Sequence, residues 1–450
     1  MNTRFKTIGA LGMAALIATA PSLAIAAPNP TAAEAAADAV GGGTGYIFNT
    51  LLFLIGGFLV MWMAAGFAML EAGLVRTKNV STQCLKNIGL YSIAGLMFWV
   101  IGYNIAYPFG GEASSALFGI AGGPYAMQGV GEADLETGYS VASDWFFQMV
   151  FCATTASIVS GTVAERVKIV PFFIFVTVLT AVIYPVVVSW EWGGGYLDTE
   201  WGFSDFAGST LVHSTGGWAA LMGAIIIGSR VGRYGADGRV NVFPGSNIPL
   251  ATLGTFILWL GWFGFNGASQ LAMGTVGDAS DVSKIFVNTN MAACGGVVVA
   301  IVLTQLRYKK ADVTMALNGA LAGLVSITAE PLAPTVGQSI LIGMVGGAIV
   351  VFTVPLLDKL KIDDVVGAIP VHLFAGIWGT LIVAWTGDAT FVGQLVGVLL
   401  TAVWVSAISA ILWFALKATI GVRPSEEIEV AGLDVHETGV EAYPGIANQA

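Results

Sequence analysis

The chain has 450 residues, of which 56% are hydrophobic and only 10% are charged, and its mean hydropathy is +0.80. Soluble domains carry about 25% charged residues, so this composition excludes a soluble protein and predicts a polytopic protein of the lipid bilayer. The formal net charge of −10 disfavours a nucleic-acid partner, because no basic surface could offset it. The 59 glycines suit close contact between helices in lipid.

The N-terminus has the features of a targeting segment. Arg4 and Lys6 precede an apolar run that ends in small residues of the A-x-A type at Ala26. This pattern predicts a cleavable signal peptide over residues 1–26, and an uncleaved first helix is the alternative. The proline- and alanine-rich segment 27–44 is then expected to be a periplasmic leader.

Apolar runs of spanning length recur from Tyr46 onward, and eleven transmembrane helices are expected. The runs lie at 47–72, 84–107, 145–163, 170–189, 209–228, 249–268, 285–305, 314–329, 337–356, 366–386 and 391–415. The run at 314–329 is short, which predicts a tilted or partly broken span. The fold class is therefore an all-α membrane protein, with a transmembrane domain at 45–419 and a polar tail at 420–450.

Basic residues orient these spans, because cytoplasmic loops carry an excess of Lys and Arg. They follow the odd-numbered spans, at Arg76, Lys78, Lys86, Arg166, Lys168, Arg230, Arg233, Arg239, Arg307, Lys309, Lys310, Lys359, Lys361, Lys417 and Arg423. Only Lys284 falls on the other side. We therefore predict a periplasmic N-terminus and a cytoplasmic C-terminus.

Acidic residues are assigned to loops on the opposite side of the membrane. They are Glu112, Glu132, Asp134, Glu136, Asp144, Asp198, Glu200, Asp205, Asp278 and Asp281. A field of this sign raises the concentration of cations at a pore mouth. Ordinary solvated loop charge is the alternative interpretation.

Two segments share one pattern, D-x2-G-x3-V-H-x3-G. They run over 205–217 and 364–376 and contain two of the three histidines, His213 and His372. Small residues surround each histidine on its helix face, so a packing role is one interpretation. Ionisable residues inside spans are usually functional, however, and these two occupy the fifth and tenth spans. The pattern predicts two inverted five-helix repeats plus one bracing helix, with the histidines paired near the bilayer midplane.

The sequence gives little support for an enzyme or a metal site. Cys84, Cys152 and Cys294 form no CxxC spacing and are expected to be packing residues. The sequence contains no H-E-x-x-H or G-x-S-x-G motif, so an intramembrane enzyme ranks last among the functions considered. No catalytic residue, metal or cofactor is predicted.

Several motifs, taken together and in order, resemble those of the Amt/Mep/Rh ammonium transporters, and within them the bacterial Amt proteins. They are Ala68–Arg76, the G-x-x-A-E-R turn at Gly161–Arg166, Trp192–Gly195, Asp205 to His213, the G-W-F-G-F-N-x-x-S run at Gly261–Ser269, Ile362–Asp364 with His372, and Gly432 to Tyr443. The resemblance extends from about Phe58 to Tyr443, nearly the whole chain after the signal peptide. It implies a transporter of ammonium in the bacterial inner membrane.

The resemblance also implies roles for residues on the external side. Trp192, Phe151 and Ser269 match a recruitment site in which aromatic faces and a hydroxyl receive NH4+. Cation–π attraction contributes about 0.5–2 kcal/mol in such a site. Phe151 and Phe265 match a stacked phenyl gate beneath it. Before the resemblance is considered, packing is the more common role of such aromatic residues, and Ser269 could instead bond a backbone carbonyl.

For the pore itself, the resemblance implies that the imidazoles of His213 and His372 share a hydrogen bond. Asp205 matches a carboxylate near the start of the fifth span, where it is expected to cap the helix and order the site rather than touch the ion. An intact cation at the bilayer centre costs from about 3 to more than 10 kcal/mol. Removing a proton costs roughly 3–5 kcal/mol for a pKa a few units above neutral. We therefore expect NH4+ to lose its proton near the gate and to cross as NH3.

The sequence departs from the family pattern after Asp364. Val365 and Gly367 replace a proline and an acidic residue, which puts any contact of the missing carboxylate in doubt. Pro370 is expected to kink or locally unwind the tenth span.

The family further implies a homotrimer whose cytoplasmic tail couples its subunits, with a PII-type regulatory protein as a possible partner. A disordered terminus is the alternative for the tail, and His436 within it has no predicted pore role. The rival functions are an ammonium sensor on the same fold, disfavoured because the short tail leaves no room for a signalling domain, and an Rh-like neutral gas channel.

Overall fold

The computed structural model describes residues 42–110, 112–121 and 137–444. The predicted signal peptide at 1–26 lies outside the described residues, as does most of the leader at 27–44. Within the described ranges the fold is helical, and the single bridge between Tyr234 and Val240 belongs to no strand.

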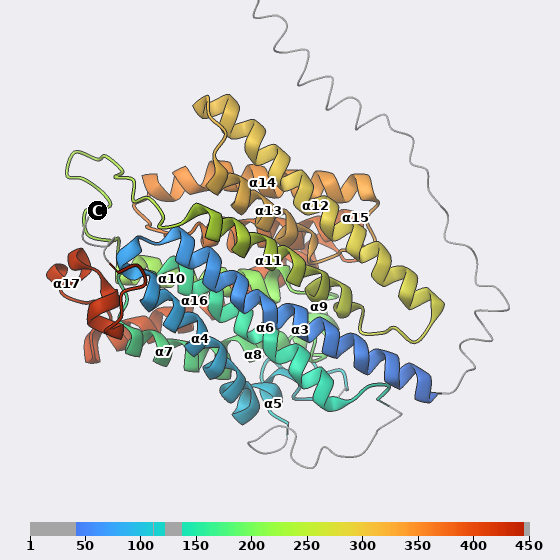
Figure 1. The fold of residues 1–450 in the computed structure, drawn as a ribbon. Coiled ribbons are helices and arrows are strands. Elements are labelled where there is room, and N and C mark those ends of the chain that lie inside the picture. The colour runs from blue at the N-terminus through green and yellow to red at the C-terminus, as the bar shows by residue number, and fades with distance from the viewer. Residues whose placement is uncertain (1–41, 111, 122–136, 445–450) are drawn as a thin grey trace, which may run out of the picture.

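Long helices lie side by side and make up the body of the protein (Figure 1). They are α3 (Gly42–Leu74), α4 (Val80–Met97) with its continuation α5 (Tyr103–Ala106), α6 (Val141–Thr162), α7 (Ile169–Val178) with its continuation α8 (Tyr184–Ser189), α10 (Thr215–Ile227), α11 (Ile248–Gly267), α12 (Val276–Tyr308), α13 (Val313–Ile327), α14 (Val336–Lys359), α15 (Ala375–Thr386) and α16 (Phe391–Thr419). Two short helices, α9 (Tyr196–Trp201) and α17 (Glu426–Ala431), lie at opposite ends of the body.

A helix occupies each of the eleven predicted ranges. Nine helical segments in the described part of the chain are long and apolar enough to cross a membrane, which confirms an all-helical membrane protein. The other two are α13, which is shorter, and α6, which carries Asp144, Gln148 and several hydroxyl side chains. The full count of eleven spans therefore stays a prediction.

Glycine lets these helices approach closely. A Cβ atom added at Gly254 of α11 would overlap the backbone nitrogen of Leu70 in α3, and one at Gly343 of α14 would overlap the carbonyl oxygen of Ala292 in α12. Helices in lipid gain their contact energy from van der Waals packing, so small residues at crossing points are favourable. The abundance of glycine is thus explained by helix contacts.

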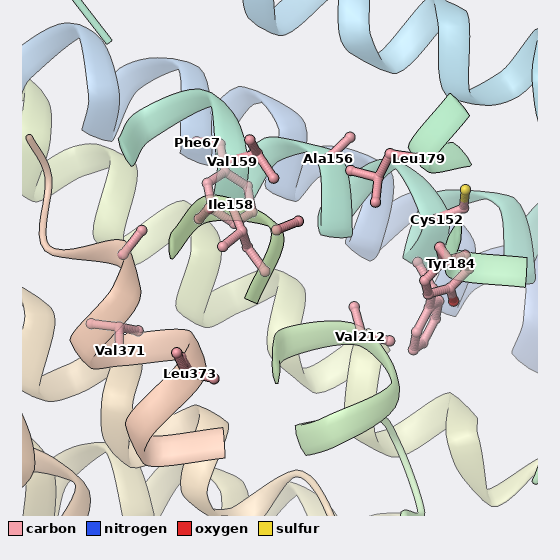
Figure 2. Packing of buried hydrophobic residues seen from close by; sticks show 14 of the residues in the cluster. Phe67, Cys152, Ala156, Ile158, Val159, Leu179, Tyr184, Val212, Val371 and Leu373 are labelled. Carbon is pink, nitrogen blue, oxygen red and sulfur yellow. The ribbon is translucent and has the colours of Figure 1, made fainter. Parts of the chain in front are cut away.

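The interior is a continuous cluster of buried apolar side chains. Figure 2 shows members of this cluster around the centre of the molecule, among them Phe67, Ile158, Val212 and Leu373. The three cysteines are free, and Cys152 is a buried member of the cluster. The centre of the bundle is therefore largely apolar, and polar groups there need specific partners.

The two repeated segments adopt the same local structure. Each begins with a wide π-helical turn, η4 (Ser209–Ser214) and η6 (Ile369–Phe374), which continues into α10 and α15 respectively. Each is preceded by a glycine with positive φ, Gly208 at 108° and Gly367 at 81°. Residues with a Cβ rarely adopt this conformation, which explains the first glycine of the pattern.

The last glycine of each repeat lies where the two segments meet. A Cβ at Gly217 would lie 2.7 Å from Cβ of Leu373, and one at Gly376 would lie 2.6 Å from the carbonyl oxygen of Ser209. The hydroxyls of Thr210 and Thr380 share a 2.6 Å hydrogen bond across the same contact. The repeated pattern therefore specifies a close pairing of η4–α10 with η6–α15.

Pro370 lies in the wide π-helical turn η6, so the helix is locally widened at this proline as expected. The tenth helical segment begins at Ile369, so the proline occupies the first turn, where its missing N–H leaves no helical bond unmade. The η4 turn has the same π-helical form without a proline. The widening of the helix therefore does not require a proline.

Candidate functional site

The two repeated histidines touch at the centre of the molecule. Nδ1 of His213 lies 3.1 Å from Nδ1 of His372, and the two rings stack with centroids 5.1 Å apart. Both side chains are buried. In neutral imidazoles one of the two Nδ1 atoms must carry the hydrogen and donate it to the other, so the rings hold different tautomers.

Asp205 caps the start of η4, the segment that contains His213. Its Oδ1 accepts the backbone N–H groups of Gly208 and Ser209 at 3.0 and 2.7 Å, and its Oδ2 accepts those of Thr210 and Leu211 at 2.7 and 2.8 Å. These are unpaired donors at the start of a helix, and a carboxylate there is favourable. Asp205 lies in the loop before η4 and caps it as expected, but it is fully buried and so adds no charge to the protein surface.

Asp364 does the same for the second segment. Its carboxylate accepts the N–H of Gly367 at 3.2 Å and of Ile369 at 2.7 Å, and also the hydroxyl of Thr162 at 3.1 Å. The aspartate of the repeated pattern is therefore a helix cap in both copies. Together the two caps fix where each segment begins, and this determines the position of its histidine along the bundle.

Aromatic rings continue the stack beyond His213. The ring of Phe265 lies 5.1 Å from that of His213, and Phe151 lies 4.1 Å from Phe265 with an interplanar angle of 31°. Both phenylalanines are buried. The two residues predicted as a gate thus form one apolar plug directly against the histidine pair.

Trp262 is a functional candidate for which no role was predicted from the sequence. Its ring stacks on His213 at 4.9 Å with an interplanar angle of 17°, and its Nε1 donates to the Thr328 hydroxyl at 2.8 Å. Trp262 precedes Phe265 by three residues, so both project from the same face of α11. That spacing could have indicated a shared role. By stacking on it, the tryptophan restricts the orientation of the His213 ring.

A pocket of about 510 Å³ lies on the other side of the phenylalanine plug. Trp192, Phe151 and Ser269 all line it, so the structure brings the three predicted recruitment residues together. The Trp192 indole donates to the carbonyl of Asp205 at 2.9 Å, and its ring meets Phe151 edge-on at 6.0 Å. The Ser269 hydroxyl bonds the carbonyl of Phe265 at 2.7 Å. Because the serine hydroxyl donates its hydrogen to this carbonyl, the lone pairs of the serine oxygen remain available to a ligand.

Asp144 lines the same pocket and was misplaced by the sequence analysis. It lies in the first turn of α6 rather than in a loop, and it is only 7% exposed. The Tyr103 hydroxyl donates to its Oδ2 at 2.6 Å, and Gln148 approaches its Oδ1 at 3.5 Å. The pocket therefore combines aromatic faces with one carboxylate, which suits a small cation.

A second, much smaller cavity of about 10 Å³ lies on the far side of the histidine pair. Apolar side chains make up most of its wall, with His372 at one end. The described residues thus form a linear series: an open outer pocket, the phenylalanine plug, the two histidines and a narrow inner cavity.

The family comparison decides the class of protein that contains this series. The model of the Ammonium Transporter Family matches residues 51–443. The chain belongs to the ammonium transporter family. The match includes every residue of the outer pocket, the plug and the histidine pair.

The sequence is similar to those of curated relatives over most of their length. The chain is 39% identical to the ammonium transporter Amt2 of Archaeoglobus fulgidus over 423 residues, which cover 87% of each protein. It is 38% identical to a putative ammonium transporter of Synechocystis, covering 88% of this chain and 89% of the relative.

Solved structures of the family share the fold. A structure titled Sensor Amt Protein superposes with a TM-score of 0.82 at 34% identity, covering 88% of this chain and 99% of that one. Mep2 of Candida albicans gives a TM-score of 0.76 at 24% identity over 84% of this chain and 86% of its own, a likeness of fold alone.

The tail of this family member packs against the body where it is described. Arg423 forms two hydrogen bonds of 2.8 Å with Glu429, which also accepts the N–H of Val231 at 2.7 Å. Asp434 accepts the N–H groups of Ser81 and Thr82 at 3.0 and 2.8 Å and so caps α4. His436, by contrast, is exposed on the tail.

The departure at Gly367 has a conformational reason. With φ at 81°, and with a Cβ there only 2.5 Å from the Asn318 amide, this position disfavours any side chain. The acidic residue expected from the family pattern would therefore need a different turn. In this family member the position is a tight glycine turn that packs against Asn318 of α13.

Proposed function

We propose that this protein takes up ammonium, binding NH4+ in the outer pocket and conducting NH3 past the histidine pair. The single observation that carries the proposal is the 3.1 Å contact between the two Nδ1 atoms, directly beneath the phenylalanine plug. This arrangement offers a polar rail one molecule wide in an otherwise apolar interior. No metal or cofactor has a part in this mechanism.

The outer pocket selects the substrate by charge and size. Trp192 and Phe151 present ring faces and edges, Ser269 offers a hydroxyl oxygen, and the Asp144 carboxylate supplies negative charge. Charge-assisted hydrogen bonds to oxygen acceptors favour NH4+ over K+, which has no hydrogens to donate.

The plug enforces the loss of a proton. Phe151 and Phe265 offer no acceptor that could replace the hydration of a cation. A charge in such surroundings costs from about 3 to more than 10 kcal/mol, against roughly 3–5 kcal/mol for deprotonation, and the released proton crosses separately from the ammonia. Neutral ammonia passes on to the imidazoles of His213 and His372, which accept and donate hydrogen bonds at once. K+ is rejected because it has no proton to lose.

The setting of this activity is also part of the proposal. Eleven spans in two inverted five-helix repeats and a bracing helix, a periplasmic N-terminus and a cytoplasmic tail would place the outer pocket in the periplasm of a bacterial inner membrane. A homotrimer and a PII-type regulatory partner at the cytoplasmic face complete it. The curated relatives that carry the name ammonium transporter support the substrate.

Reconstitution into liposomes tests this function. An ammonium gradient should produce a current that protein-free liposomes lack, together with a faster change in lumenal pH than theirs, and an equal K+ gradient should produce neither. Uptake with a pH change but no current would instead favour the neutral gas channel. Absence of both signals in correctly folded protein would contradict transport.

An ammonium sensor is the second candidate, favoured by the likeness to the structure titled Sensor Amt Protein. The same fold serves both possibilities, so flux decides between them. A sensor would bind ammonium in the outer pocket with negligible flux in the liposome experiment, whereas a transporter shows both binding and flux.

A further inference from the structure

We propose that Glu71 provides an ammonium-binding site on the cytoplasmic side of the histidine pair, an inference that rests on the proposed transport function. Glu71 lies in the last turn of α3 and is only 1% exposed. The mechanism described above gives this carboxylate no role.

One oxygen of Glu71 is fully engaged. Its Oε2 accepts hydrogen bonds from the amide of Gln83, from the amide of Asn87 at 2.8 Å and from the hydroxyl of Ser160 at 2.9 Å. These donors come from α4 and α6 and hold the carboxylate rigidly. Its orientation is therefore fixed without any help from the second oxygen.

The second oxygen, Oε1, is buried and has no hydrogen-bond partner among the described residues. A Cβ atom built on Gly161 would lie 3.3 Å from Oε1 and 2.5 Å from the Val366 side chain. Gly161, Val366 and Glu71 all line the inner cavity, which His372 lines as well. The free oxygen thus lies at the wall of the cavity that follows the histidine pair.

A buried lysine balances the charge of Glu71 without occupying this oxygen. The Lys86 ammonium donates to the carbonyl of Ser160 at 2.8 Å and to the Gln83 side-chain oxygen at 3.3 Å, and it lies 4.5 Å from the ring centre of Phe172. Gln83 and Ser160 therefore bridge lysine and carboxylate. A direct ion pair would have used both charges, whereas this arrangement leaves Oε1 with free lone pairs.

An unsatisfied carboxylate oxygen in a buried site costs free energy unless a donor reaches it. The cavity of about 10 Å³ admits one molecule the size of water. Ammonium and ammonia have that size and carry N–H donors, so they fit both the space and the oxygen. Beside a carboxylate the charged form gains the stronger hydrogen bond, so ammonia leaving His372 is held there as NH4+ once it takes a proton from cytoplasmic water.

A transport experiment on membranes of defined orientation tests the site. In Glu71→Gln, the half-saturating ammonium concentration measured from the cytoplasmic side should rise about tenfold, the loss expected for one charge-assisted hydrogen bond. The value measured from the outer side should stay the same. An unchanged cytoplasmic value in a variant that transports would overturn the inference, while absence of transport in the wild type would overturn the proposed function instead.

The double variant Glu71→Gln/Lys86→Gln separates binding from charge balance. It removes both charges together, so no buried charge is left unpaired if the single variant fails to fold. If Glu71 binds ammonium, the double variant keeps the raised cytoplasmic value. Recovery of the wild-type value would mean that Glu71 only neutralises Lys86, and the inference would be wrong.

Infrared difference spectroscopy distinguishes ammonium from water at this oxygen. Exchanging sodium for ammonium should shift a carboxylate band in the wild type, and this shift should be absent in Glu71→Gln. A spectrum in which the two proteins respond identically would mean that water alone fills the cavity.

Discussion

Single carboxylates with unusual surroundings distinguish this molecule from a plain apolar channel. Asp144 lies among aromatic rings at the outer pocket, and Asp205 and Asp364 cap the two histidine segments. Each has a different set of donors, and these donors determine its task. A carboxylate saturated by backbone N–H groups orders the chain, whereas one with a tyrosine and an amide beside an open pocket remains available to a cation.

Substitution of Asp144 is expected to weaken the binding of ammonium in the outer pocket. Asp144→Asn keeps the size of the side chain and removes its charge, so the half-saturating ammonium concentration from outside should rise about three- to tenfold, as for the loss of one charged hydrogen-bond partner. Maximal flux should change little. Asp198→Asn, at an exposed acidic residue of α9, is the matched control and should behave like the wild type. Equal effects of the two substitutions would mean that Asp144 has no specific role in binding ammonium.

At the scale of elements, the paired segments η4–α10 and η6–α15 carry the architecture. The repeated letters D, G, H and G have separate physical roles in each copy: cap, positive-φ turn, contact across the pair, and close approach. A repeat of this kind could be predicted from the sequence because every letter is constrained by the same local geometry.

Gly367 tests the turn that starts the second segment. Gly367→Ala should lower the unfolding free energy by roughly 1–2 kcal/mol, because alanine is strained at positive φ and its Cβ would meet Asn318. Gly337→Ala, in the first turn of α14 where nothing lies within 4 Å of the new Cβ, should be neutral or slightly stabilising. Thermal unfolding in detergent measures both. A Gly367→Ala protein as stable as Gly337→Ala would contradict the role given to this turn.

The sequence located the spans, the histidine pair and the aromatic residues of the outer pocket, because hydropathy and motif spacing report on these directly. It could not locate Glu71, since one carboxylate near the end of an apolar run looks like a solvated helix terminus. Asp144 was misjudged for the same reason. Burial of such residues depends on neighbouring helices, which a linear pattern does not contain. Pro370 was expected inside the span rather than in its first turn because the helix start was placed three residues early.

At the scale of the whole molecule, an ionic network joins the loops and helix ends around Glu165, Arg230 and Asp363. Arg230 forms two side-chain hydrogen bonds with Asp363, at 2.8 and 2.9 Å, and reaches Glu165 at 3.2 Å, while Glu165 also pairs with Arg76. Burial alone would raise the pKa of Asp363, but the nearby Arg166 and Arg230 guanidinium groups bring it below its usual range. The contact between Arg230 and Asp363 joins segments that lie 133 residues apart in the chain.

This lowered pKa predicts the response to acid. A carboxylate whose pKa is lower in the folded than in the unfolded state stabilises the fold above its usual pKa of about 4, and the contribution is lost as the pH falls toward the folded value. The thermal midpoint of the wild type should therefore drop on acidification below about pH 4. Asp363→Asn should start from a lower midpoint at neutral pH and show a smaller drop. Parallel pH profiles for the two proteins would contradict this assignment.

The proposed transport path requires ammonia to pass along the paired imidazoles of His213 and His372. Ammonium-dependent flux in liposomes, measured with K+ as the competing ion, tests this path most directly. His213→Ala and His372→Ala should each lower ammonium flux by at least about fivefold, the loss of roughly one hydrogen bond from the rail, or else admit K+. If both variants fold and keep the flux and the K+ discrimination of the wild type, the histidine pair is not the path.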